Sequence, residues 1–171
     1  MVLAVAHDRE SFSLIAKKAF PNTPVPTEVL LSGDHRGDIW DEIKSRFIGR
    51  QWTEITLDAW INTASIQTLV GSSFTPQAFH YYVPSILIGS LENENYLDWG
   101  IDAVLPNNKN HIPRGEWWAV YKNSFSTRQA KVVEEFLRLA LNSVDPYSQE
   151  YLLCQTGLDL WKSPINDCPD K

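Results

Sequence analysis

His80 is the residue best suited to catalysis by its type and its neighbours, because the phenols of Tyr81 and Tyr82 follow it directly. The pKa of a histidine side chain lies close to neutral pH, so a histidine in a pocket can serve as a general acid or base. Together with the positive charge of Arg50, the group predicts an enzyme whose cleft surrounds these four residues. The alternative is a core histidine satisfied by its neighbours, because one histidine outside a motif is a weak catalytic signal.

A second group of residues indicates binding. Acidic and aromatic side chains gather in the segment 92–118, as Glu92, Glu94, Tyr96, Asp98, Trp99, Asp102, Trp117 and Trp118. Aromatic anchors surrounded by charge are typical of protein-binding hot spots, and carboxylates steer a basic partner toward such a surface. Exposed tryptophans also stack against sugar rings, so carbohydrate binding is a further hypothesis. A polar loop that covers packed aromatic residues would show the same composition.

The sequence contains no motif for zinc, phosphate or acyl-transfer chemistry, since it has neither a phosphate-binding loop nor a G-x-S-x-G turn. The histidines and cysteines show no metal-ligand spacing: His7, His35, His80, His111, Cys154 and Cys168. We therefore expect no metal, no cofactor and no disulfide framework. The Arg-Gly-Asp triplet at 36–38 is interpreted as a turn followed by a helix cap, not as an adhesion motif.

The balance of charge argues against nucleic acid as a partner. The 171 residues include 15 lysines and arginines against 21 aspartates and glutamates, which gives a formal net charge of −6. Phosphate contacts require a basic surface that this composition does not supply. The N-terminal apolar stretch is too short for a signal peptide, and the longest apolar run, 81–91, falls short of the ~20 residues of a membrane helix. We expect a cytoplasmic protein that does not enter a membrane.

The segment 75–91 predicts the central helix that positions these residues. Thr75 provides a side-chain cap, and Pro76 suits the first helical position. Apolar side chains cover nearly all sides of this helix, which predicts that it is buried. Pro84 removes one backbone donor and predicts a kink. We expect a structural role around this kink for Arg50, Trp52, Phe79, Tyr82 and Pro84.

Helical periodicity, caps and breaks divide the rest of the chain. Helices are predicted over 9–19, 39–47, 57–70, 116–122, 127–141 and 146–161. Short apolar pieces at 23–31 and 103–106 are the candidates for a minor hairpin. Residues 92–114 are predicted to form an irregular loop, and 163–171 a flexible tail. The expectation is one compact, mainly α domain over 1–171, with about six helices and a kinked, buried central helix.

Three segments occur in the order FIGRQWTEIT, FTPQAFHYYVP and FSTRQAKVVEEFL. They resemble a family of small bacterial proteins of unknown function that share an Arg-x-Trp segment and the pattern Leu-Thr-Pro-x-Ala-Phe-x-Tyr-Tyr-Leu-Pro. Here Phe74 and Val83 replace the two leucines of that pattern. The resemblance covers residues 10–141, apart from the tryptophan-rich part of 92–118. It implies a helical fold and a bacterial origin, and it brings no catalytic residues.

These observations lead to the hypothesis of an immunity protein that neutralises a cognate bacterial toxin. Small acidic bacterial proteins often accompany toxin genes, and neutralisation by occlusion requires no catalytic residue. An acidic and aromatic surface would bind a basic toxin and block its active cleft. The alternatives are an enzyme of unknown reaction at His80 and a carbohydrate-binding module that uses exposed tryptophans.

Overall fold

The computed structural model describes residues 2–32 and 37–162, with side chains from Arg9 onward. The α-helices are α1 (Val2–Ala19), α2 (Asp38–Arg46), α3 (Leu57–Ile61), α4 (Ile66–Leu69), α5 (Pro76–Glu92), α6 (Leu97–Ala103), α7 (Glu116–Asn123), α8 (Thr127–Ser143) and α9 (Gln149–Trp161). Two 3-10 turns, η1 (Trp52–Glu54) and η2 (Glu94–Tyr96), lie between them. The predicted all-α fold is confirmed. The predicted tail, 163–171, and Arg36 of the Arg-Gly-Asp triplet lie outside the described residues.

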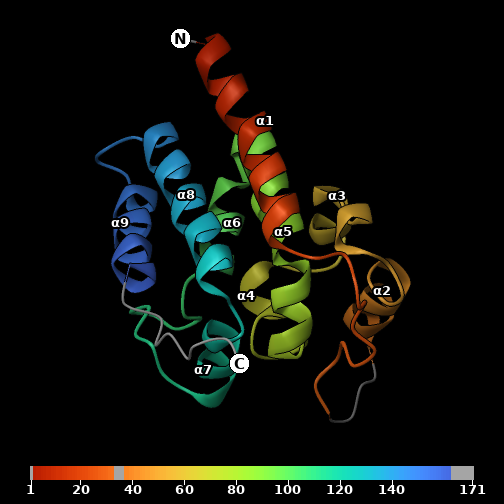
Figure 1. The fold of residues 1–171 in the computed structure, drawn as a ribbon. Helices are drawn as coiled ribbons and strands as arrows, with labels where there is room; N and C mark the ends of the chain where they lie inside the picture. The colour runs from red at the N-terminus through yellow and green to blue at the C-terminus, as the bar shows by residue number, and fades with distance from the viewer. Residues whose placement is uncertain (1, 33–36, 163–171) are drawn as a thin grey trace.

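α5 is the central helix, as the sequence predicts (Figure 1). Thr75 caps it, because Thr75 Oγ1 accepts the backbone N–H of Ala78 at 3.2 Å. Pro84 lies inside the helix without ending it. Beside this proline, the Trp60 indole N–H donates to Ser85 Oγ at 2.9 Å, and Ser85 Oγ donates to the Tyr82 carbonyl at 2.7 Å. These hydrogen bonds tie α3 to the middle of α5.

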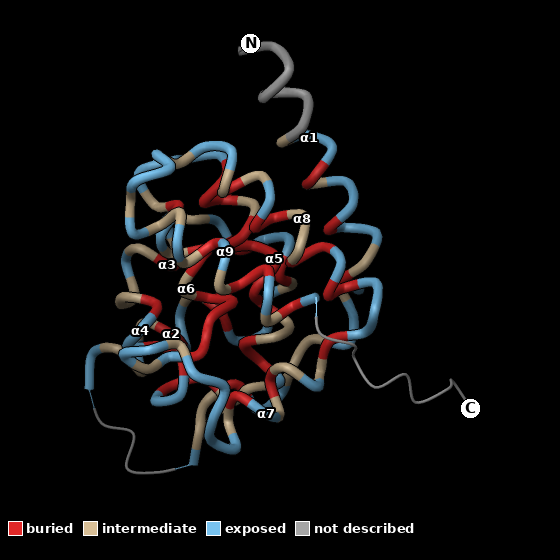
Figure 2. Tube along the Cα trace, turned by 90° about the vertical axis from the view of Figure 1, so that its left-hand side faces the viewer, coloured by how far each residue is buried: buried red, intermediate tan, exposed pale blue. Residues whose placement is uncertain are grey.

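Helices from both the N-terminal and C-terminal parts of the chain pack around α5 and bury a hydrophobic core against it. α1, α3, α6, α7 and α8 all contact α5, and α9 packs on the outer side of α8 (Figure 1). Buried residues gather along α5 and on the inner sides of its neighbours, as Figure 2 shows. Burial of apolar area is the main favourable contribution to the free energy of folding. The packing of the other helices on α5 is therefore central to the stability of this fold.

The predicted helix over 57–70 is wrong, because the chain forms two short helices there, α3 and α4. Asn62 ends α3, where its side-chain amide donates to the Asp58 carbonyl at 2.8 Å. Ser65 begins α4, where its hydroxyl accepts the Thr68 N–H at 3.4 Å. Polar side chains that bond to nearby backbone compete with helical hydrogen bonds, and the two caps divide the segment.

The predicted irregular loop over 92–114 contains η2 and α6, so the described residues have nine α-helices where about six were expected. Gly100 lies in the middle of α6, pressed against α5 and α8. A Cβ on Gly100 would lie 2.2 Å from Ser90 Oγ and 2.6 Å from Phe136 Cζ. Glycine weakens a helix in isolation, but here its lack of a side chain permits the close packing that holds α6 in place. The irregular part of this segment is 104–115.

The predicted minor hairpin is also wrong. Over residues 2–32 and 37–162 there is no strand, and Leu30 and Phe74 form an isolated antiparallel bridge. Thr75 reinforces the contact, because its backbone N–H donates to the Val29 carbonyl at 2.8 Å. The extended segment before α2 is therefore tied to the start of α5 without forming a sheet.

Candidate functional site

His80 lies in an aromatic part of the core. Its Nε2–H donates to Gln129 Oε1 at 3.2 Å, and its ring packs on Phe125 and Phe20 at centroid distances of 4.5 and 5.8 Å. Burial lowers the pKa of His80, with the Gln129 hydrogen bond opposing that shift, so the imidazole is neutral at pH 7. His80 does not line the cavities beside Asp102, Trp117 and Trp52 that are described below.

The two tyrosines after His80 hold the preceding segments against α5. The Tyr82 hydroxyl donates to the Phe47 carbonyl at 2.7 Å, and burial raises the pKa of Tyr82 to about 12. The Tyr81 hydroxyl donates to the Asn22 carbonyl at 2.6 Å and accepts the Trp52 backbone N–H at 3.4 Å. Both phenols are therefore occupied by backbone groups, which is how buried tyrosines are normally satisfied.

The residues expected to have a structural role differ in their surroundings. Phe79, Tyr82, Pro84 and Trp52 are buried in the core. Arg50 is exposed, and its guanidinium donates to the Ser45 carbonyl at 3.2 Å. Neither Arg50 nor His80 lines the cavities beside Asp102, Trp117 and Trp52, so the catalytic cleft expected around Arg50 and His80 is none of these three.

The acidic residues of the predicted binding group follow one another along the chain from the end of α5 through η2 and α6. We call this region the acidic surface and define it by Glu92, Glu94, Asp98 and Asp102. Asp102 is half-buried and the other three are exposed. Glu94 forms an ion pair with Arg9 of α1. Tyr96 and Trp99 pack edge to face at 5.6 Å, both half-buried, and support the turn that carries these acids.

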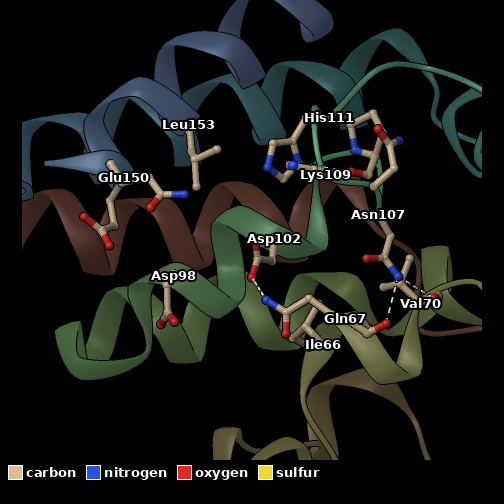
Figure 3. Close-up of a pocket in the computed structure, with 13 residues that line it drawn as sticks. Ile66, Gln67, Val70, Asp98, Asp102, Asn107, Lys109, His111, Glu150 and Leu153 are labelled. Atoms are coloured by element: carbon tan, nitrogen blue, oxygen red, sulfur yellow. Dashed lines mark hydrogen bonds between the residues drawn. The ribbon is translucent and has the colours of Figure 1, made fainter.

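Asp98 and Asp102 line a cavity of about 410 Å³, which we call the acidic cavity (Figure 3). The two carboxylates come from one side of α6, because they are four residues apart. Glu150 and Leu153 of α9 form a second side, and Ile66 and Gln67 of α4 form a third. Residues 106–109 and 111 close the cavity. It thus combines three carboxylates with an apolar wall.

The carboxyl group of Asp102 is held in an environment that disfavours its charge. Burial, together with the nearby Asp98 carboxylate, raises the pKa of Asp102 to about 6. His111 and a hydrogen bond from the Gln67 side-chain amide act in the opposite direction without cancelling the shift. A cation placed in the acidic cavity would stabilise the ionised form, since opposite charges favour each other most where water is partly excluded.

The loop that closes the acidic cavity is fixed by its own side chains. Asn107 Nδ2 donates to the carbonyls of Gln67 and Val70 at 2.7 and 2.9 Å. His111 Nδ1–H donates to the Pro106 carbonyl at 3.0 Å, and His111 has a positive φ of 50°. A left-handed residue of this kind persists where its surroundings hold it, so this wall of the cavity is preformed.

Trp117 and Trp118 do not belong to the acidic surface. They line a neighbouring cavity of about 540 Å³ with Arg114, Gly71 and Ser72, which we call the tryptophan cavity. The Trp117 indole N–H donates to the Phe74 carbonyl at 2.9 Å, and Trp117 is half-buried. Trp118 is only 7% exposed. Both rings are therefore anchored in the core and offer only part of their surface to a ligand.

Sequence reasoning found the acids of α6 but missed the residues that face them. Gln67, Lys109, His111 and Glu150 come from three other segments, and all of them line the acidic cavity. The run PNNKNH at 106–111 indicates a loop by its composition. Which helices a loop closes against depends on tertiary packing, so the sequence alone carried no signal for this arrangement.

A third cavity, about 180 Å³, lies between α1, η1 and α5 beside Trp52. The Trp52 indole N–H has no hydrogen-bond partner among the described residues.

No group of three or more histidine, cysteine, aspartate or glutamate side chains within the described part of the chain could hold a metal ion. Cys154 is a free, buried thiol, and burial raises its pKa to about 12. No helix in the described ranges is both long and apolar enough to cross a membrane.

Comparison of the chain with protein-family models, with curated proteins and with solved structures finds no match. The resemblance to a bacterial family, based on the segments around Trp52, Phe79 and Gln129, therefore stays a prediction. A functional proposal has to rest on the geometry and charge of the sites themselves.

Proposed function

We propose that this protein binds a basic bacterial toxin through the acidic surface and neutralises it by occlusion, as an immunity protein does. The observation that carries the proposal is the acidic cavity, which is lined by the half-buried Asp102 and by Asp98 and Glu150. Like charges brought together near a partly buried site are unfavourable until a positive group neutralises them. A basic partner would supply that group.

The net charge of −6 supports the same proposal. Carboxylates gathered on one surface attract a basic protein over a distance and speed the encounter, and the effect weakens as salt is added. Of the acidic surface, Glu92 and Asp98 are exposed and available to a partner, whereas Glu94 is occupied by Arg9. Occlusion of a toxin requires shape and charge on the inhibitor, and no catalytic residue.

Neutralisation is the test of this proposal, with capture as its first step. The tagged protein is used to isolate basic proteins from its native bacterium, and each captured protein is then expressed alone in a second bacterial host. We expect one of them to stop growth and the protein to restore growth when both are expressed. We also expect the double variant Glu92→Lys/Asp98→Lys to lose this rescue, with an association rate reduced about tenfold or more.

A matched control separates the acidic surface from net charge. Glu10 and Glu28 are exposed and lie on α1 and in the segment before α2, outside the acidic surface. The control variant Glu10→Lys/Glu28→Lys changes the net charge by the same amount, and we expect it to keep the rescue. If no captured protein is toxic, or if both double variants rescue growth equally, the proposal is wrong.

A further inference from the structure

The acidic cavity and the tryptophan cavity adjoin each other. Both are lined by Gln67, Val70, Asn107 and Asn108. One wall runs from α4 into the turn at 70–72, and the opposite wall is the loop 106–115. We call the combined depression the groove. Each cavity is of a size that ordinarily accommodates a ligand group, since ligand pockets measure roughly 300–1,000 Å³.

The two ends of the groove differ in chemistry. At one end, Asp98, Asp102 and Glu150 provide negative charge, and Ile66 and Leu153 provide an apolar surface beside it (Figure 3). That combination matches a lysine or arginine side chain, whose charged head is carried on a stem of methylene groups. Lys109 and His111 stand on the loop at this end and leave the carboxylates in excess.

The other end of the groove is aromatic. Trp117 and Trp118 line it together with Gly71 and Gly115, two residues without side chains. Both glycines have a positive φ, 78° and 86°, which favours glycine at these positions. Their lack of side chains leaves the tryptophan surface open to an apolar or aromatic group, which would gain by burial there. Arg114 flanks this end from the loop side.

The middle of the groove is held in shape by hydrogen bonds between its walls and within the loop that forms one of them. Asn107 Nδ2 donates to the carbonyls of Gln67 and Val70, and Asn108 Oδ1 accepts the Ile112 N–H at 3.0 Å. A groove that is already formed costs less ordering on binding than one that has to close around its ligand. The two ends are thus held at a fixed separation, which suits a ligand that carries two side chains.

We propose that the groove binds an extended peptide segment of the basic partner, with a lysine or arginine side chain in the acidic cavity and an apolar side chain in the tryptophan cavity. This inference rests on the proposed function, since it names the part of the toxin that the immunity protein holds. Charge complementarity fixes the direction of the segment, because the basic residue fits only the end that carries the carboxylates. The exposed acid Glu92 lies outside the groove and contributes to steering.

The test uses the purified full chain and short capped peptides of glycine and serine that carry one lysine and one phenylalanine at varied separation. Calorimetry measures their affinity for the wild type and for three variants. Asp102→Asn should weaken binding about tenfold or more, because a charge-assisted hydrogen bond is lost. Ser72→Phe, which fills the tryptophan cavity from an exposed position, should remove the preference for phenylalanine over alanine in the peptide. Glu10→Gln is the control and should bind as the wild type does.

Peptides with glutamate in place of lysine should bind about tenfold more weakly than those with lysine. The inference is overturned if no lysine–phenylalanine peptide binds, if glutamate peptides bind equally well, or if Asp102→Asn binds as the wild type does. Circular dichroism and thermal unfolding verify that each variant is folded.

The peptide measurements and the growth rescue can refute the groove proposal and the immunity proposal separately. If Asp102→Asn and Ser72→Phe both rescue growth fully while Glu92→Lys/Asp98→Lys does not, the immunity function stands and the groove proposal is wrong. If no toxin is found, the immunity proposal fails, and the peptide affinities of the isolated protein still decide whether the groove binds such segments.

Discussion

Replacing Asp102 with asparagine should stabilise the protein at neutral and alkaline pH. The carboxyl group is half-buried beside Asp98, and burial raises its pKa from the ordinary 3.8 to about 6. Asparagine has nearly the same shape and keeps an oxygen that can accept the hydrogen bond from the Gln67 amide. The substitution therefore removes the unfavourable charge and leaves the packing intact.

The sign of the effect follows from the direction of the pKa shift. A carboxyl whose pKa is higher in the folded state than in the unfolded chain favours folding while it is protonated, below about pH 4. That advantage is lost as the pH rises through about 6, where folded Asp102 ionises. Two pH units correspond to roughly 3 kcal/mol. Because the group is partly exposed and screened by water, we expect about 1 kcal/mol.

The assay is urea unfolding of the wild type and Asp102→Asn, followed by tryptophan fluorescence from pH 4 to pH 8. The two free energies of unfolding should agree near pH 4, and Asp102→Asn should be more stable by about 1 kcal/mol at pH 8. Glu10→Gln, at an exposed position on α1, should follow the wild type throughout. Parallel curves for the wild type and Asp102→Asn, or a less stable Asp102→Asn at pH 8, would refute the reasoning.

Three further substitutions test how the fold is held together. Tyr82→Phe removes the hydroxyl that donates to the Phe47 carbonyl and should cost about 1 kcal/mol, because that carbonyl keeps a second donor in the chain. Gly100→Ala should cost about 2 kcal/mol or more, because a Cβ would lie 2.2 Å from Ser90 Oγ. Ser126→Ala removes the side-chain cap of α8 and should cost about 1 kcal/mol. Urea unfolding measures all three.

Each of these substitutions has a matched control on the surface. Tyr147 is 97% exposed, so Tyr147→Phe should leave stability unchanged. Gln155→Ala, at an exposed position within α9, introduces alanine into a helix without close packing and is the control for Gly100. Ser11→Ala, on an exposed side of α1, is the control for the loss of the cap. Equal stability of a core variant and its control would contradict the role assigned to the buried group.

Helices whose ends are set by their own residues were predictable from the sequence. α5 begins behind the Thr75 cap and α8 behind Ser126, and both caps form as expected. α6 was not predictable, because a glycine such as Gly100 indicates a turn in a sequence. Its role in the helix is evident only from the close packing of α5 and α8 against it. The break between α3 and α4 was not predictable for a related reason. A serine such as Ser65 can cap a new helix or lie within an existing one, and the sequence does not distinguish the two.

The candidate site was likewise predictable from the sequence only in part. The acids of α6 stand out in the sequence as a cluster, and the structure places Asp98 and Asp102 on one cavity. The burial of Trp118 depends on Tyr121 of the same helix and on Trp161 of α9, which pack against it at 5.7 and 6.4 Å. A sequence shows which side chains are aromatic, and only tertiary packing decides which of them remain exposed.

Two acids of the acidic surface provide a last comparison, because the structure assigns them opposite roles. Glu94 is paired with Arg9 and ties η2 to α1, whereas Asp102 forms no ion pair with the residues that the structure describes and carries a raised pKa. Glu94→Gln should therefore lower the free energy of unfolding at neutral pH by up to about 1 kcal/mol, as expected for a surface ion pair. It should leave the affinity for lysine–phenylalanine peptides unchanged.

Asp102→Asn should show the reverse pattern, with higher stability at pH 8 and weaker peptide binding. A residue that lowers the stability of the isolated protein yet raises its affinity for a cationic ligand is best explained by binding, because His111 and Gln67 compensate for its charge only in part. Urea unfolding and calorimetry on the two variants, side by side, measure both quantities. If both substitutions change stability and affinity in the same direction, Asp102 has the same supporting role as Glu94.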